Sequence, residues 1–202
     1  MGALADCELV RGPLIGQPAN TITTIAFIIA GLAVARRADM RWMGAAIIAT
    51  GIGSLLFHGP MPPGSEWAHD TSLAWLVMVV AGWGRPWERW TRLPGLILLG
   101  VVFVAAPVVA DPVAVALVAA AMGLIIIPDR SIHNLGPIAL LGAAAIIGRL
   151  GATGGPLCDP TSAWQPHALW HVAAAGAVAW WALGRPEPAI SESAPSPERR
   201  PR

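Results

Sequence analysis

The apolar residues of this chain fall into about seven separate runs, each close to the length that crosses a lipid bilayer. They cover residues 18–35, 42–58, 68–83, 93–109, 112–127, 135–150 and 164–183. A transmembrane helix needs about 20 largely apolar residues. We therefore predict an all-α, polytopic membrane protein with seven transmembrane helices. Only Ala110 and Asp111 separate the fourth run from the fifth, so a long re-entrant pair is the alternative at that point.

The composition supports a bilayer as the solvent of this chain. Of its 202 residues, 55% are hydrophobic and only 12% are charged, and the mean hydropathy is +0.59. A soluble domain carries roughly 25% charged residues, so too little polar surface is present to solvate a globule. The net charge is +1, and no basic run is interleaved with aromatic residues, which argues against nucleic-acid binding. No feature points to a protein partner.

The arginines predict the orientation in the membrane. All 13 basic residues are arginine, and positive charge collects on the cytoplasmic side of membrane proteins. Only Arg11 and Arg149 fall on one side; the other side has Arg36, Arg37, Arg41, Arg85, Arg89, Arg92, Arg130, Arg185, Arg199, Arg200 and Arg202. The N-terminus is thus expected outside and the C-terminus in the cytoplasm. We expect a transmembrane domain over residues 1–184 and a Pro- and Ser-rich, disordered cytoplasmic tail over residues 185–202.

Five polar residues lie where an apolar span should not carry them, at the expected outer ends of three runs. Ser54 and His58 are four residues apart, as are His167 and His171, and Asp70 opens the third run. Residues four apart share one face of a helix. An ionisable residue at the centre of a span costs about 2.5–3.5 kcal/mol and is functional by default.

Three imidazoles at one depth indicate a metal site. Catalytic zinc keeps three protein ligands and an open position for water, and it lowers the pKa of that water towards about 7. The ligands would be His58, His167 and His171. A carboxylate such as Asp70 could accept the proton, and a hydroxyl such as that of Ser54 could stabilise an oxyanion.

Each of these residues also has a simpler interpretation when it is taken alone. A single histidine at a helix end is usually interfacial, Ser54 could be a packing residue, and Asp70 could cap its helix. The metal interpretation depends on their coincidence at one depth. We expect the neighbouring His69 to point away from the ligands, and His133 to be solvated in an inner loop.

The order of these motifs resembles the alkaline ceramidases, in a superfamily of seven-span membrane hydrolases that includes the adiponectin-receptor relatives. The matching segments, from Cys7 to His171, are CE, PANTITT, GSLLFH, an aspartate about a dozen residues further on, LCD and QPHALWH. The resemblance implies zinc on His58, His167 and His171, with Asp70 and Ser54 at the zinc-bound water. It also implies hydrolysis of a ceramide amide to a sphingoid base and a fatty acid.

The resemblance has two further implications for the N-terminal segment. The first is a calcium site involving Asp6, Glu8 and Asn20, although Gln17 stands where the family has a glutamate. The second concerns the two cysteines, Cys7 and Cys158. Both are expected on the outer side, where oxidising conditions permit a disulfide; two free thiols are the alternative. The family has cysteines at both places, which implies that they pair.

Three functions are compatible with these observations. The first is a zinc-dependent lipid amidase acting on a ceramide-like membrane lipid. The second is a seven-helix receptor or sensor with a structural metal site, which would normally need a fourth ligand. The third is a transporter or channel, which would need polar residues continuing to the inner side. The all-arginine basic residues and short loops suggest a bacterial inner membrane protein with its site facing the periplasm.

Overall fold

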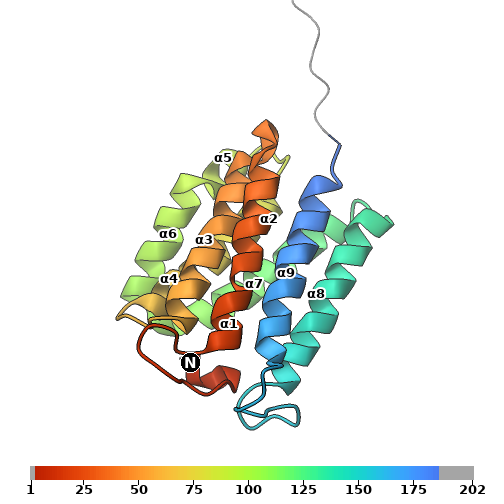
Figure 1. The fold of residues 1–202 in the computed structure, drawn as a ribbon. Coiled ribbons are helices and arrows are strands. Elements are labelled where there is room, and N and C mark those ends of the chain that lie inside the picture. The colour runs from red at the N-terminus through yellow and green to blue at the C-terminus, as the bar shows by residue number, and fades with distance from the viewer. Residues whose placement is uncertain (1–2, 187–202) are drawn as a thin grey trace, which may run out of the picture.

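The computed structural model describes residues 3–186, and within that range every regular element is a helix (Figure 1). The elements in chain order are η1 (Ala3–Asp6), α1 (Pro18–Thr23), α2 (Ile25–Ala35), η2 (Ala38–Met40), α3 (Arg41–His58), α4 (Ser65–Gly82), α5 (Glu88–Thr91), α6 (Leu93–Ala105), η3 (Pro107–Val109), α7 (Ala110–Ile126), α8 (Ile132–Leu150) and α9 (Pro166–Leu183). The prediction of an all-α fold is confirmed. The predicted tail lies outside the described residues from position 187 onward.

Each predicted apolar run coincides with a helix or a pair of consecutive helices. Four stretches are long and apolar enough to cross a membrane, namely Pro18–Ala35, Ala38–His58, Pro107–Ile126 and Ile132–Leu150. The chain is therefore a multi-pass membrane protein. Helix α6 is apolar but has only 13 residues. Helices α4 and α9 have 18 residues each but include the charged and polar residues discussed above, which lower their hydropathy. Seven crossings remain a prediction.

The first run is divided into two helices at Thr24, which the apolar pattern did not predict. The hydroxyls of Thr21 and Thr24 donate hydrogen bonds to the carbonyls of Gln17 and Thr21, at 2.6 and 2.7 Å. Hydroxyls that bond to a carbonyl three or four residues back bend helices. The bend lets α1 contact α9 and α3, and α2 continue along α3 and α9.

Helix α3 lies between α2 and α4 and packs against both. Its glycines permit this close approach. A Cβ added at Gly44 would come within 2.7 Å of Ala35 Cα, and one at Gly53 within 2.9 Å of the Ala68 carbonyl oxygen. Small residues at helix contacts are typical of membrane proteins, where packing rather than the hydrophobic effect drives association. The contact at Gly53 sets the distance between the last turn of α3 and the first turns of α4.

The outward faces of α6, α7 and α8 carry exposed aliphatic side chains. Val101, Val115 and Ile146 have exposed fractions of 62%, 69% and 64%. A soluble protein rarely exposes a continuous apolar surface of this extent. These faces are where lipid chains would contact the protein.

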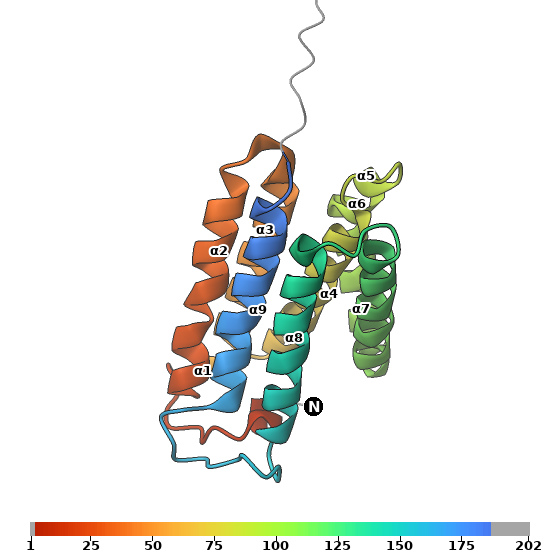
Figure 2. The same cartoon turned by 90° about the vertical axis from the view of Figure 1, so that its right-hand side faces the viewer.

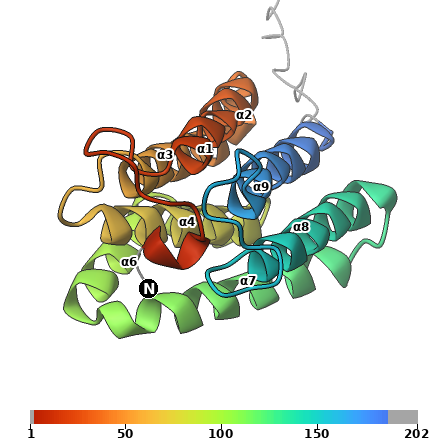
Figure 3. The ribbon, with the colours of Figure 1, turned by 60° about the horizontal axis from the view of Figure 1, so that its bottom comes forward.

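The two ends of the bundle differ in what they carry (Figures 1 and 2). The N-terminal segment, the start of α1 and the loop between α8 and α9 lie at one end, and α9 finishes at the other. At the latter end, the Arg37 guanidinium donates to Asp39 and to the Arg185 carbonyl oxygen, at 2.8 and 2.6 Å. Figure 3 shows the first end brought forward, with the N-terminal segment beside the loop that precedes α9.

Candidate metal centre

His58 is the last residue of α3 and is fully buried. The chain turns at Gly59, and the N-terminal segment pairs with this turn. The backbone N–H of Gly16 donates to the Gly59 carbonyl oxygen at 2.8 Å, and that of Gln17 donates to the His58 carbonyl oxygen at 2.9 Å. The end of α3 is therefore fixed by the segment that leads into α1.

His167 and His171 lie in the first two turns of α9, on one face. The helix begins at Pro166, which suits a first position because it has no N–H to satisfy. The ring centre of His58 is 5.0 Å from that of His167 and 5.0 Å from that of His171, and the latter two are 4.6 Å apart. One ligand nitrogen from each ring lies within 4.8 Å of the others. The prediction that these three histidines converge is confirmed.

The Nε2 atoms of all three rings are buried, and among the described residues none has a hydrogen-bond partner. Buried polar atoms in folded proteins are nearly always satisfied, so three such atoms in one cluster of rings require an explanation. A metal ion bound by the three lone pairs would provide it. The set of donors fits zinc, which binds imidazole nitrogen and forms catalytic sites with three histidines.

The three Nδ1 atoms, in contrast, all face oxygen atoms. Histidines that bind metals normally donate their other ring N–H to an oxygen, which fixes the tautomer and the ring orientation. The pairs are His58 with Gln17 Oε1 at 2.7 Å, His167 with Asp6 Oδ1 at 3.3 Å, and His171 with Thr23 Oγ1 at 3.1 Å and the Asn20 carbonyl oxygen at 3.2 Å. Every one of these oxygens belongs to residues 6–23.

The N-terminal carboxylates have separate partners. Both oxygens of Glu8 accept backbone N–H groups at the start of α1, from Ala19 at 2.7 Å and from Asn20 at 2.8 Å. Asp6 instead faces His167 and also lies 3.9 Å from His58 Nδ1. Burial raises the pKa of the Asp6 carboxyl to about 6, while His69 acts to lower it. A calcium site on Asp6, Glu8 and Asn20 stays a prediction.

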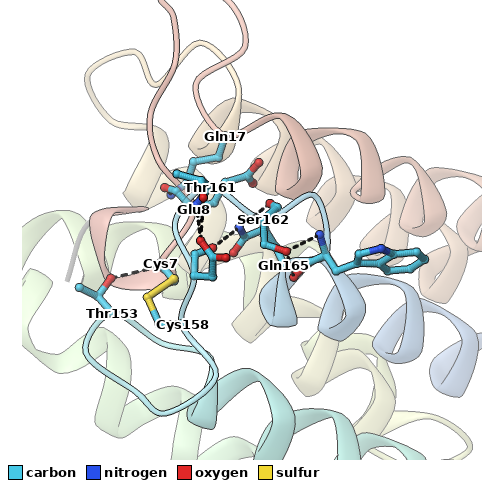
Figure 4. Close-up of a disulfide and its surroundings, with 10 residues drawn as sticks. Cys7, Glu8, Gln17, Thr153, Cys158, Thr161, Ser162 and Gln165 are labelled. Carbon is cyan, nitrogen blue, oxygen red and sulfur yellow. Dashed lines mark hydrogen bonds between the residues drawn. A yellow bond between two sulfur atoms is a disulfide. The ribbon is translucent and has the colours of Figure 1, made fainter.

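A disulfide joins Cys7 to Cys158, as predicted (Figure 4). It connects the N-terminal segment to the loop that leads into α9. Backbone hydrogen bonds reinforce this connection, because Leu9 N donates to the Pro160 carbonyl oxygen at 3.1 Å and Thr153 N to the Ala5 carbonyl oxygen at 2.9 Å. The segment carrying Asp6 is thus attached to the chain that positions His167.

The two predicted catalytic residues lie on different helices. Ser54 is buried in α3, one turn before His58. Asp70 is partly exposed on α4, and its Oδ1 is 2.8 Å from His69 Nδ1. Within the described chain, Asp70 makes no hydrogen bond or ion pair with the three clustered histidines. His69 lies between Asp70 and the histidine cluster. Its ring stacks on that of Phe57 with ring centres 4.7 Å apart, and its ring centre is 6.2 Å from that of His58.

Asp70 also lines a cavity of about 580 Å³ between α4, α6 and α7. Apolar side chains form much of its wall, and two further carboxylates contribute. The lining residues are Gly64, Glu66, Trp67, Asp70, Phe103, Val104, Pro107, Val108, Ala110 and Asp111. Asp70 therefore lies between this cavity and His69.

Three contributors to the site were not recognised as such in the sequence: Gln17, Asp6 as a partner of His167, and His69. The only signal for Gln17 was its position directly before the Pro-Ala-Asn start of the first helix.

No family model, curated protein or solved structure matches this chain.

Proposed function

We propose that this chain is a zinc-dependent lipid amidase of the membrane, which hydrolyses ceramide or a ceramide-like N-acyl lipid to an amine and a free fatty acid. The observation that carries the proposal is the convergence of three buried Nε2 atoms without partners, from His58, His167 and His171. Three ligands leave one coordination position free, which is typical of catalytic rather than structural zinc. The resemblance of the surrounding motifs to alkaline ceramidases supports the same conclusion.

We propose further that all seven long helical runs cross the membrane, with the N-terminus outside and the C-terminus in the cytoplasm. Arg37, Arg85 and Arg185 surround the end where α9 finishes, which agrees with a cytoplasmic location for that end. The histidines and the disulfide lie at the opposite end. In a bacterial inner membrane this end faces the periplasm, where a disulfide is stable.

The proposal assigns a chemical role to each of these residues. When bound, zinc would polarise the substrate carbonyl and activate a water molecule. Water adds to the carbonyl carbon, the carbon–nitrogen bond breaks, and the leaving nitrogen takes a proton. Asp70 is proposed to accept the proton of water and return it to that nitrogen, and Ser54 to donate a hydrogen bond to the carbonyl oxygen as it gains charge. The apolar wall of the cavity beside Asp70 suits an acyl chain.

The test measures free fatty acid released from N-acyl sphingoid bases and from other N-acyl amides by the purified, zinc-loaded protein. His167→Ala should lose both metal and turnover. Asp70→Asn should keep the metal and lose about 10²–10⁴ in turnover, the usual contribution of a proton-transfer group. Ser54→Ala should lose about 10²–10³, as expected for one oxyanion donor.

The matched control is His133→Ala, which removes an exposed histidine at the start of α8 and should change neither metal content nor turnover. If the zinc-loaded protein releases no fatty acid from any of these lipids, or if Asp70→Asn matches the parent rate, the amidase proposal is wrong. Stoichiometric zinc without turnover would support the sensor alternative, in which the metal is structural.

A further inference from the structure

The side chain of Gln17 connects the N-terminal segment to His58. It is completely buried. Its Oε1 lies 2.7 Å from His58 Nδ1 and 3.3 Å from Asn20 Nδ2, and its Nε2 donates to the Glu8 carbonyl oxygen at 2.9 Å. The backbone N–H of Gln17 donates to the carbonyl oxygen of the same histidine at 2.9 Å. Gln17 thus contacts both the backbone and the ring of His58.

The hydrogen-bond network fixes the orientation of the Gln17 amide. The Glu8 backbone carbonyl can only accept, so it must face the NH₂ group of Gln17, and the amide oxygen then lies on the side of Asn20 Nδ2. A flipped amide would place two acceptors, its own oxygen and the Glu8 carbonyl oxygen, against each other. The group that faces His58 Nδ1 is therefore the amide oxygen.

An amide oxygen can only accept, which determines the protonation of His58. Its Nδ1 must carry the ring proton, so that Nε2 holds the lone pair in the neutral imidazole. That Nε2 is a buried atom without a partner, in a ring that is clustered with those of His167 and His171. One neutral side chain thus selects the tautomer of His58 that can bind a metal and also holds the ring in place.

We propose that Gln17 is a positioning residue of the metal centre, which holds His58 in the Nδ1-protonated form with Nε2 directed at the ion. This inference rests on the metal site of the proposed function and is independent of which lipid is hydrolysed. Loss of such an outer partner typically weakens metal binding about 10–100-fold.

The experiment measures the zinc dissociation constant of full-length protein in detergent, by competition with a chelator. Gln17→Leu removes the acceptor and should bind zinc about 10–100-fold more weakly. Gln17→Glu keeps an oxygen opposite Nδ1 and should restore most of that affinity. The control is Asn134→Leu, which removes an equally buried amide at the other end of the molecule and should leave the affinity unchanged. With Co²⁺ in the site, the visible absorption should change in Gln17→Leu and not in Asn134→Leu.

A second measurement uses the parent protein and does not depend on the folding of a variant. In ¹⁵N-histidine-labelled parent protein loaded with zinc, the His58 ring should show a protonated Nδ1 and a metal-bound Nε2. The inference is overturned if Nδ1 binds the metal, if Gln17→Leu binds zinc as the parent does, or if Asn134→Leu loses affinity equally. A parent protein that binds no zinc overturns the proposed function as well, whereas zinc binding without lipid hydrolysis contradicts only the amidase.

Discussion

At the scale of single residues, the three clustered histidines have different partners at Nδ1. His58 faces an amide, His167 a carboxylate, and His171 a backbone carbonyl and a hydroxyl. The side chain of His167 is also the most exposed of the three, at 20%. The Asp6 carboxylate is closer to Nδ1 of His167, at 3.3 Å, than to Nδ1 of His58, at 3.9 Å. We therefore expect the metal affinity of His167 to depend most on this charged neighbour.

Replacing Asp6 tests this difference. Asp6→Asn should weaken zinc binding by about 10-fold, the lower part of the range for outer partners, because an amide is a poorer acceptor than a carboxylate. Competition with a chelator measures the zinc dissociation constant of each variant. Asp159→Asn is the control, since the Asp159 carboxylate lies in the loop before α9 and accepts hydrogen bonds from Thr161 and Ser162 of that same loop. Equal affinities in both variants and the parent would show that Asp6 gives His167 no support.

At the scale of elements, the segment that runs from η1 to α1 contributes most to orienting the three histidine rings. Residues 6–23 supply every oxygen that faces a Nδ1 atom of the three histidines. This segment is held by the Cys7–Cys158 disulfide and by the Glu8 carboxylate at the start of α1. Its attachment is therefore part of the metal centre.

Removing the disulfide should loosen both the fold and the site. The double variant Cys7→Ser/Cys158→Ser should lose about 2–5 kcal/mol in free energy of unfolding, the usual range for a native disulfide. It should also release zinc faster, because Asp6 is no longer fixed beside His167. Thermal unfolding and zinc release to a chelator measure the two effects. Reducing the parent with a phosphine should reproduce both, and the same reductant should leave the double variant unchanged; a parent that is insensitive to reduction would contradict this role.

The sequence was sufficient to predict the helices and the three clustered histidines. It was insufficient to predict the residues that contact and orient the histidine rings. The positions of His167 and His171 follow from a helical period of 3.6 residues, which is local. The roles of Gln17, Asp6 and His69 depend on the path of an irregular segment and on the rotation of α4, neither of which leaves a periodic signal. The break between α1 and α2 at Thr24 likewise results from hydroxyl–carbonyl hydrogen bonds, which a pattern of apolar residues does not reveal.

At the scale of the whole molecule, the orientation can be tested independently of activity. We expect alkaline phosphatase fused after residue 160, in the loop before α9, to be active in bacterial cells, because the proposed orientation places that loop outside. The same enzyme fused after Arg202 should be inactive, whereas a fluorescent protein at that position should fold and fluoresce. The reverse pattern would place the histidines on the cytoplasmic side and contradict the proposed orientation.

The distribution of the ligands along the chain also affects how the molecule is made. His58 ends α3, but its two companions are on α9, the last helix of the described chain. During synthesis, α3 enters the membrane long before α9 exists, and a lone imidazole holds zinc weakly. In the proposed zinc site, the ion can bind firmly only after α9 has inserted and brought His167 and His171 to His58. Metal uptake would then mark the insertion of α9, and a chain interrupted before α9 would remain without zinc.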